Sequence, residues 1–180
     1  MITKTKVFGA VALLALMAIV SAPAFATTGS GSVAVTATTV ASVSMTFSSD
    51  VSGIALTGDG TSAATIAFGS VQAYGGTVPT GVTKTLNGIT NWKLSTPFDV
   101  KVEVANQTSS NYTLTAQLAS ADAVNTWDLT GTAINDATAT SITALGAYDT
   151  ATPYTLNLTI PFSEAAGSIS NTINFVATAN

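Results

Sequence analysis

Apolar and polar residues alternate through the last part of the chain, residues 154–180. The apolar positions of two successive runs are Tyr154, Leu156, Leu158, Ile160 and Phe162, then Ile169, Ile173, Phe175 and Ala177. A period of two is typical of a strand with one buried face. The intervening S-E-A-A-G predicts a turn, so we expect the two strands to form an antiparallel pair. Neither strand can bury its apolar face alone, so other strands must supply a second sheet or close a barrel.

Strands and turns also account for the rest of the chain beyond its N-terminal region, and no segment there has helical periodicity. The cleanest alternation runs through residues 98–104, and residues 112–118 are expected to return as its partner strand. Further strands are expected at 33–47, with a break near Thr39, and at 51–56, 64–68, 82–86 and 89–94, with two short ones within 119–151. Asn87-Gly88 is a hairpin signal. Many short strands with regular turn signals predict one all-β domain, a sandwich spanning residues 40–180.

The N-terminal segment, residues 1–26, has the features of a signal peptide. Lys4 and Lys6 precede an apolar run, and Ala24-Phe-Ala26 forms a small-x-small cleavage site. The apolar run is short for a membrane-spanning helix. We therefore expect export, cleavage after Ala26, and no membrane segment in the mature chain.

Residues 27–39 predict a flexible leader that carries a strand. Gly29-Ser-Gly-Ser32 is a good tether, and Val33, Val35 and Ala37 then alternate with small or polar residues. A strand on a tether can complete its own sheet, or it can add to a sheet of a neighbouring subunit as a donor strand. The sequence leaves both alternatives open.

Composition narrows the classes of function. The chain has no Cys, His or Arg, and beyond residue 26 three lysines stand against nine acidic residues, a net charge of −6. Such a surface cannot neutralise a run of phosphates, so nucleic acid is not expected as a partner. The fold needs no disulfide. Few charges also leave strand edges weakly protected against association, which suits a self-assembling subunit.

The sequence contains few residues that could act in catalysis or bind a metal. Without His or Cys, the chain has no Ser-His or Cys-His nucleophile pair, and zinc loses its usual ligands. Asp99 and Glu103 share one strand face but lie about 13 Å apart, too far for a glycosidase pair. Residues 57–61 and 135–136 hold loop oxygens but do not match a calcium-loop pattern. We therefore expect no enzymatic activity, no metal and no cofactor.

Trp92 and Trp127 can be interpreted in two ways, as core residues or as surface contacts. Large aromatic side chains in a small sandwich mostly belong to the core, but at the surface they could stack on a sugar ring or on a partner.

Residues 166–177, A-G-S-I-S-N-T-I-N-F-V-A, resemble the closing motif of bacterial spore coat protein U-type and fimbrial subunit domains. Residues 66–71 (I-A-F-G-S-V) are similar to the F-G-x-Y segment of those families, and residues 96–100 and 152–156 to their T-P-Y/F strand starts. Ile169 stands where those families have an aromatic residue, and their common cysteines are missing here. The resemblance implies an immunoglobulin-like sandwich that is secreted to build surface fibres or coats.

The function expected from these observations is a secreted structural subunit of an extracellular filament, pilus or surface coat. It would form a homopolymer by strand exchange, with a periplasmic chaperone as a candidate partner. The candidate donor residues are Val33, Val35 and Ala37, and the candidate C-terminal assembly strand carries Ile169, Ile173, Phe175 and Ala177. The alternative is a secreted carbohydrate-binding or adhesive module. Exposure of Trp92, Trp127 and Tyr148 on one face would favour that alternative, whereas buried aromatics beside an open groove would favour assembly.

Overall fold

The computed structural model describes residues 43–105 and 109–180, and within them the chain forms nine strands and no helix. These residues accordingly contain no helix long and apolar enough to cross a membrane. The predicted signal peptide, residues 1–26, and the candidate donor segment, residues 27–39, lie outside the described residues.

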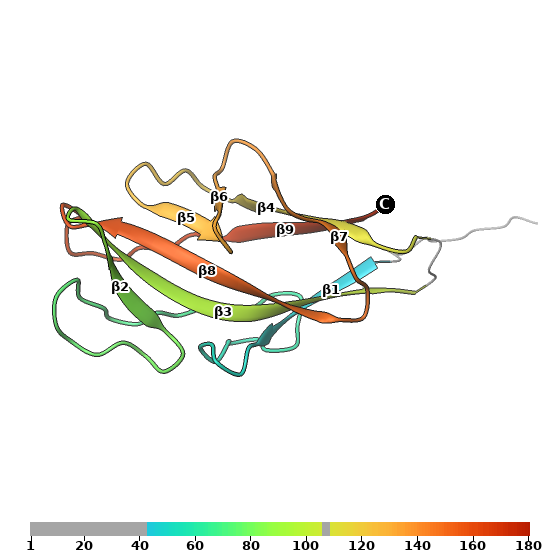
Figure 1. Ribbon diagram of the computed structural model, residues 1–180, viewed down its shortest axis with the longest axis horizontal. Coiled ribbons are helices and arrows are strands. Elements are labelled where there is room, and N and C mark those ends of the chain that lie inside the picture. Colours follow the sequence, from blue (N-terminus) through green and yellow to red (C-terminus); the bar gives the residue numbers. More distant parts are fainter. Residues whose placement is uncertain (1–42, 106–108) are drawn as a thin grey trace, which may run out of the picture. The chain divides into compact units, whose positions relative to one another are not determined.

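The strands form two antiparallel sheets, which confirms the all-β class expected from the sequence (Figure 1). The larger sheet has the order β1-β3-β8-β5-β6, with β2 also paired to β3, and the smaller sheet has the order β7-β4-β9. The strand bounds are β1 Val43–Ser49, β2 Thr83–Asn87, β3 Asn91–Val104, β4 Tyr112–Leu118, β5 Thr126–Leu129, β6 Thr132–Ile134, β7 Thr140–Gly146, β8 Ala151–Pro161 and β9 Ile173–Ala179.

Strand β3 runs through the middle of the larger sheet. The sequence predicts two strands here, but the structure joins them into one continuous strand that pairs with β8 along most of its length. On its other edge β3 pairs first with β2 and then with β1. Pro97 lies where the partner changes, between Ser95, which faces β2, and Phe98, which faces β1. A residue without an N–H is best tolerated at such a gap in the ladder.

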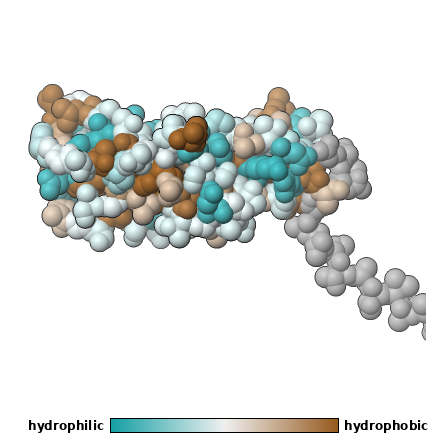
Figure 2. Space-filling view, turned by 90° about the horizontal axis from the view of Figure 1, so that it is seen from below, coloured by the Kyte–Doolittle hydropathy of each residue, from teal (hydrophilic) through white to brown (hydrophobic). Residues whose placement is uncertain are grey.

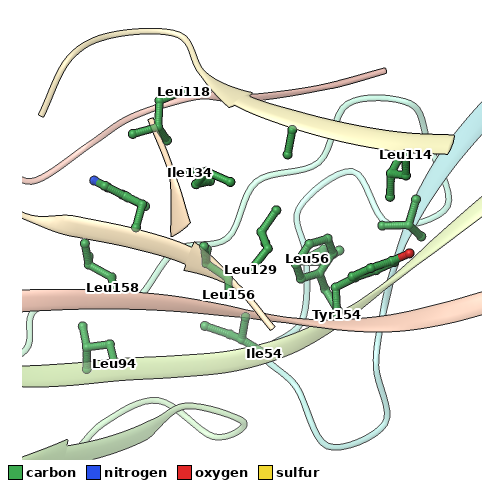
Figure 3. Packing of buried hydrophobic residues seen from close by; sticks show 14 of the residues in the cluster. Ile54, Leu56, Leu94, Leu114, Leu118, Leu129, Ile134, Tyr154, Leu156 and Leu158 are labelled. Carbon is green, nitrogen blue, oxygen red and sulfur yellow. The ribbon is translucent and has the colours of Figure 1, made fainter. Parts of the chain in front are cut away.

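The core lies between the two sheets (Figure 3). Leu114 and Leu118 of β4 point toward Leu94 of β3 and toward Leu156 and Leu158 of β8, and all five are buried. This is the alternation predicted from sequence, because every second residue of each strand reaches the facing sheet. The inward positions of β3, β4 and β8 named in the sequence are confirmed as core.

The long connection from β1 to β2 is held against β3 by a buried threonine. The Thr96 hydroxyl donates a hydrogen bond to the carbonyl of Gly81 and accepts one from the Ile54 amide, at 2.8 Å and 3.0 Å. Gly81 and Gly53 meet so closely that a Cβ on Gly81 would lie 2.1 Å from the Gly53 carbonyl carbon. This connection contains neither of the strands predicted at residues 51–56 and 64–68. Hydrogen bonds from turns and from Thr96 replace the expected ladders.

The last two strands do not form the hairpin predicted from the sequence. Strand β8 pairs with β3 and β5 in the larger sheet, whereas β9 pairs with β4 in the smaller one. Residues 162–172 carry the chain from one sheet to the other. They are too many for a tight hairpin turn, since hairpin loops mostly have two to five residues. The predicted alternation in each strand is correct. Alternation determines which face of a strand is buried, but it does not determine which strand lies alongside.

Residues 119–151 hold three strands, β5, β6 and β7, where the sequence predicts two. Strands β5 and β6 form a hairpin whose turn places Thr130 and Gly131 at φ values of 52° and 87°. This hairpin is too short to give a clear alternating pattern.

Candidate assembly groove

One side of the sandwich is open between β1 and β9. Strand β1 is hydrogen-bonded only to β3 among the strands of the structure, and β9 only to β4. The two strands belong to different sheets and do not pair with each other. On the opposite side, residues 135–139 lead directly from β6 of one sheet into β7 of the other.

A groove of about 780 Å³ occupies this open side. One wall is formed by Met45 and Phe47 of β1 together with residues 62–69, and the other by residues 169–175. Leu56, Phe98, Trp127, Leu156 and Leu158 reach it from the interior. The groove therefore opens directly onto the hydrophobic core.

Three phenylalanines face one another across the groove. The ring centroid of Phe175 lies 5.2 Å from that of Phe47 and 6.2 Å from that of Phe98. They come from β9, β1 and β3, so the cluster joins the two walls to the floor. Offset and edge-to-face arrangements at these distances are favourable for aromatic pairs.

The inward side chains of β9 are less buried than those of the strand beside it. On β4, Leu114, Ala116 and Leu118 are almost fully buried, whereas their partners on β9 are only half-buried. The partners are Ala177, Phe175 and Ile173, respectively. Both rows point into the sandwich, and the difference arises because no strand among residues 43–105 and 109–180 pairs with the outer edge of β9.

Two stretches of backbone along the groove lack ladder partners among the described residues, although Phe47 is bonded to Gly60 and Thr61. Residues 66–69 make no backbone hydrogen bond to any other described residue, although they follow Thr65, which bridges to Thr57. The edge of β9 that faces away from β4 pairs with no strand of the structure. Unpaired strand edges are templates for the addition of another strand.

The groove carries no charge among the described residues that line it. Its polar members are serines, threonines and asparagines. Asn171 is held in place, since its amide donates to the Ser120 carbonyl at 2.8 Å and accepts from the Thr172 amide at 2.9 Å. An apolar, uncharged extended segment is the chemistry that fits such a groove.

The structure brings together most of the predicted C-terminal assembly residues. Ile169, Ile173 and Phe175 line the groove, and Ala177 follows as the next half-buried inward position of β9. The strand begins at Ile173, so Ile169 belongs to the connection that precedes it. The candidate donor residues Val33, Val35 and Ala37 lie outside the described residues.

The aromatic side chains considered for surface binding are buried. Trp92 and Trp127 are each 6% exposed, and Tyr148 is 9% exposed. The Trp127 indole N–H donates to the Asp122 carboxylate at 2.8 Å. Neither tryptophan offers a ring to a ligand at the surface, which corrects their assignment as candidate surface contacts.

The opposite wall of the groove was not identified from the sequence. The alternation of Ala64, Ile66 and Phe68 was visible there, but it predicted an ordinary strand and gave no sign of a groove wall. Met45 and Phe47 were read as the inner face of a first strand, which does not tell whether that face is covered.

None of the described residues forms a group of three or more potential metal ligands. Burial would raise the pKa of Asp122, but hydrogen bonds from Asn125, Trp127 and Val124 outweigh it, so its pKa is lowered. Burial, and then the nearby Asp50 carboxylate, raise the pKa of Asp99. Both residues lie outside the lining of the groove.

Comparisons with known proteins add no relatives: no family model matches the chain, and neither a curated protein nor a solved structure matches it.

Proposed function

We propose that the chain is an exported structural subunit of an extracellular filament, pilus or surface coat, built on an immunoglobulin-like sandwich. Its subunits assemble when an apolar extended segment of one copy fills the groove of the next. The donor segment is residues 33–39, delivered after removal of a signal peptide at residues 1–26. A chaperone that offers a similar strand could occupy the same groove before assembly.

The observation that carries this proposal is the open side between β1 and β9. It combines an uncharged apolar floor with half-buried inward side chains and with backbone edges that lack ladder partners. An added strand would cover the apolar floor, complete the burial of the half-buried side chains and pair with an open edge. Its main chain would form the hydrogen bonds while alternate side chains entered the groove. Val33, Val35 and Ala37 have the apolar character and the spacing required.

The buried tryptophans support assembly over the alternative of a carbohydrate-binding module. That alternative needs exposed aromatic rings on a flat face, and Trp92, Trp127 and Tyr148 are all buried.

The test is to delete residues 27–38 from the mature chain and then to add a peptide spanning residues 31–39. The mature chain should form filaments visible by negative-stain microscopy, and the shortened chain should not. The peptide should raise the thermal midpoint of the shortened chain in a saturable, concentration-dependent way, as ligand linkage requires. A matched peptide in which Val35→Asp places a charge in the uncharged groove should fail.

A monodisperse mature chain that stays monomeric at high concentration would contradict assembly. A shortened chain that is as stable as the mature one, and that gains nothing from the peptide, would contradict the donor role of residues 33–39.

A further inference from the structure

A second exposed apolar surface lies at one end of the sandwich, apart from the groove. Tyr74 is 69% exposed, Leu86 is 64% exposed and Ile89, in the turn between β2 and β3, is 95% exposed. We name these three residues the tip patch. Figure 2 shows apolar atoms gathered at this end, on the left of the view.

Hydrogen bonds and a ring contact connect the segments that carry the three residues. The Lys84 ammonium donates hydrogen bonds to the carbonyls of Gln72 and Gly75, which fastens the loop carrying Tyr74 over β2. The Tyr74 ring stacks on Phe162 at 5.1 Å, and the Phe162 amide donates to the Thr90 carbonyl in the β2–β3 turn. The patch is therefore a well-ordered part of the surface, since each segment that carries one of its residues is hydrogen-bonded to, or stacked on, another segment.

The tip patch is connected along the chain to both walls of the groove. Residues 68–69 of one groove wall lead within a few residues to Tyr74, and Ile169 of the other wall follows Phe162 along the chain. In Figure 1 the end of β8 and the β2–β3 turn lie at the left tip, whereas β9 starts nearer the middle of the view and runs away from that tip to the C-terminus.

The direction of β1 determines whether the segment that precedes it can enter the groove from the tip-patch end in its own subunit or only in a neighbouring one. Val43, the first residue of β1, pairs with Val104 at the end of β3 far from the β2–β3 turn. A segment that precedes β1 can therefore enter its own groove only from that far end. A segment donated by a neighbour and running antiparallel to β9 instead ends beside the start of β9, at the end of the groove that is nearer to the tip patch.

The connection between donor and body is short. Residues 40–42 alone separate the donor candidate from Val43, so about 14 Å at most can separate Val43 from the last donor residue. The body of a neighbour that donates in this direction must then lie close to this end of the groove, on the side of the tip patch. The end of the neighbour that arrives, where its β1 starts, also carries an exposed apolar residue: Leu145 is 74% exposed and lies beside Gly146, which pairs with Tyr112 near the C-terminus.

We propose that the tip patch is a second contact between subunits, which receives the Leu145 end of the next copy and sets the donated strand antiparallel to β9. This inference rests on the proposed filament function. The contact joins two different surfaces, so it propagates head to tail in the same direction as strand donation. Burial of exposed apolar side chains there adds to the affinity of each junction.

The chain has no cysteine, so crosslinking can test the contact in filaments of the full mature protein. The double variant Ile89→Cys with Leu145→Cys, treated with a short bismaleimide, should give a ladder of covalent multimers. The matched control is Val51→Cys with Leu145→Cys, because Val51 is equally exposed but lies in the turn after β1 and outside the patch. That control should give no ladder.

A second variant tests the energetic role without crosslinking. Leu86→Asn with Ile89→Asn should raise the concentration needed for filaments by roughly tenfold, as expected when two apolar contacts are lost at each junction. The shortened form of the same variant should still bind the peptide of residues 31–39, because the groove is unchanged.

Each outcome bears on the proposal. Filaments of the Ile89→Cys/Leu145→Cys variant that yield no ladder, with unchanged assembly of the asparagine variant, overturn the second contact but leave strand donation standing. Covalent dimers from Ile89→Cys alone would indicate tip-to-tip contact and overturn the head-to-tail arrangement. Co-sedimentation of the monomer with phospholipid vesicles that depends on Leu86 and Ile89, without a ladder, would assign the patch to a membrane surface instead. A mature chain that forms no filament overturns both proposals.

Discussion

Replacing Ile173 with alanine should have two separable effects, because its side chain is only half-buried in the open subunit. Complete burial of such a side chain is worth about 1.5–3 kcal/mol, and alanine replacements at fully buried positions cost about 2–5 kcal/mol. With roughly half of the side chain covered, Ile173→Ala should cost the open subunit about 1–1.5 kcal/mol. A strand in the groove would cover the remainder, so the variant should lose about another 1–1.5 kcal/mol when the donor is bound.

Two variants serve as matched controls. Leu114 is fully buried on the neighbouring strand and does not line the groove, so Leu114→Ala should cost about 3 kcal/mol whether or not the groove is filled. Val176 follows Phe175 on β9 but points outward and is exposed, so Val176→Ala should change neither the stability nor the affinity for the donor.

The measurement is urea unfolding of the chain that lacks residues 27–38, with and without saturating peptide 31–39. Trp92 and Trp127 are both buried and report unfolding through their fluorescence. Titration of the peptide should give a dissociation constant roughly tenfold higher for Ile173→Ala and unchanged for Leu114→Ala. Equal losses for Ile173→Ala in the presence and absence of peptide, with equal peptide affinity, would refute the assignment of this groove as the acceptor.

Three further predictions concern the fold itself. Gly146→Ala should destabilise the domain by about 1–3 kcal/mol, because the new Cβ would lie 2.3 Å from the ring of the fully buried Tyr112, and the double variant with Tyr112→Leu should recover part of that loss in urea unfolding. The lowered pKa of Asp122 means that its stabilising contribution is present above the ordinary carboxyl pKa of 3.8 and is lost as pH falls through the lower folded value, so Asp122→Asn should flatten the loss of thermal stability on acidification. The pKa of Asp99 is shifted in the opposite direction, so its effect on stability also has the opposite sign. Its raised pKa favours the folded state at low pH and disfavours it as pH rises through the folded value. Asp99→Asn should therefore raise the thermal midpoint at pH 7 and leave it unchanged at pH 3.

The strands with strong alternation were predictable because their periodicity reflects burial directly. Residues 98–104 and 112–118 appear as the core of β3 and as β4, with the predicted faces inward. The prediction that these two strands pair with each other was wrong, because β4 pairs with β7 and β9 in the smaller sheet, whereas β3 belongs to the larger one. The assignment of β8 and β9 to one hairpin was wrong, since periodicity carries no information about which strand lies alongside. The long β3 was divided at Pro97, where the sequence signals a break but the structure only changes its edge partner.

The groove was predictable in part. Ile169, Ile173 and Phe175 follow from the C-terminal alternation, but whether that strand is covered depends on the arrangement of the sheets. The opposite wall depends on Thr96 and on the close approach of Gly53 to Gly81, which hold the connection between β1 and β2 in place. These contacts join residues far apart in the chain, and nothing in the local pattern indicates them.

The sparse charge of the chain and its open side have a common physical consequence. Isolated domains protect sheet edges with charges, bulges or covering loops. Here the groove has no charged side chain among its described lining residues, and the half-buried row of β9 lies along an edge with no strand beyond it. Leaving that surface open costs stability, and filling it with a strand from outside restores the missing burial and main-chain pairing together. We therefore expect the domain to gain stability from a strand that the described residues do not supply. If that strand comes from a neighbour, the connection through residues 40–42 is so short that each junction must also bring two subunit bodies into contact, which is why the tip patch and the groove are best tested together.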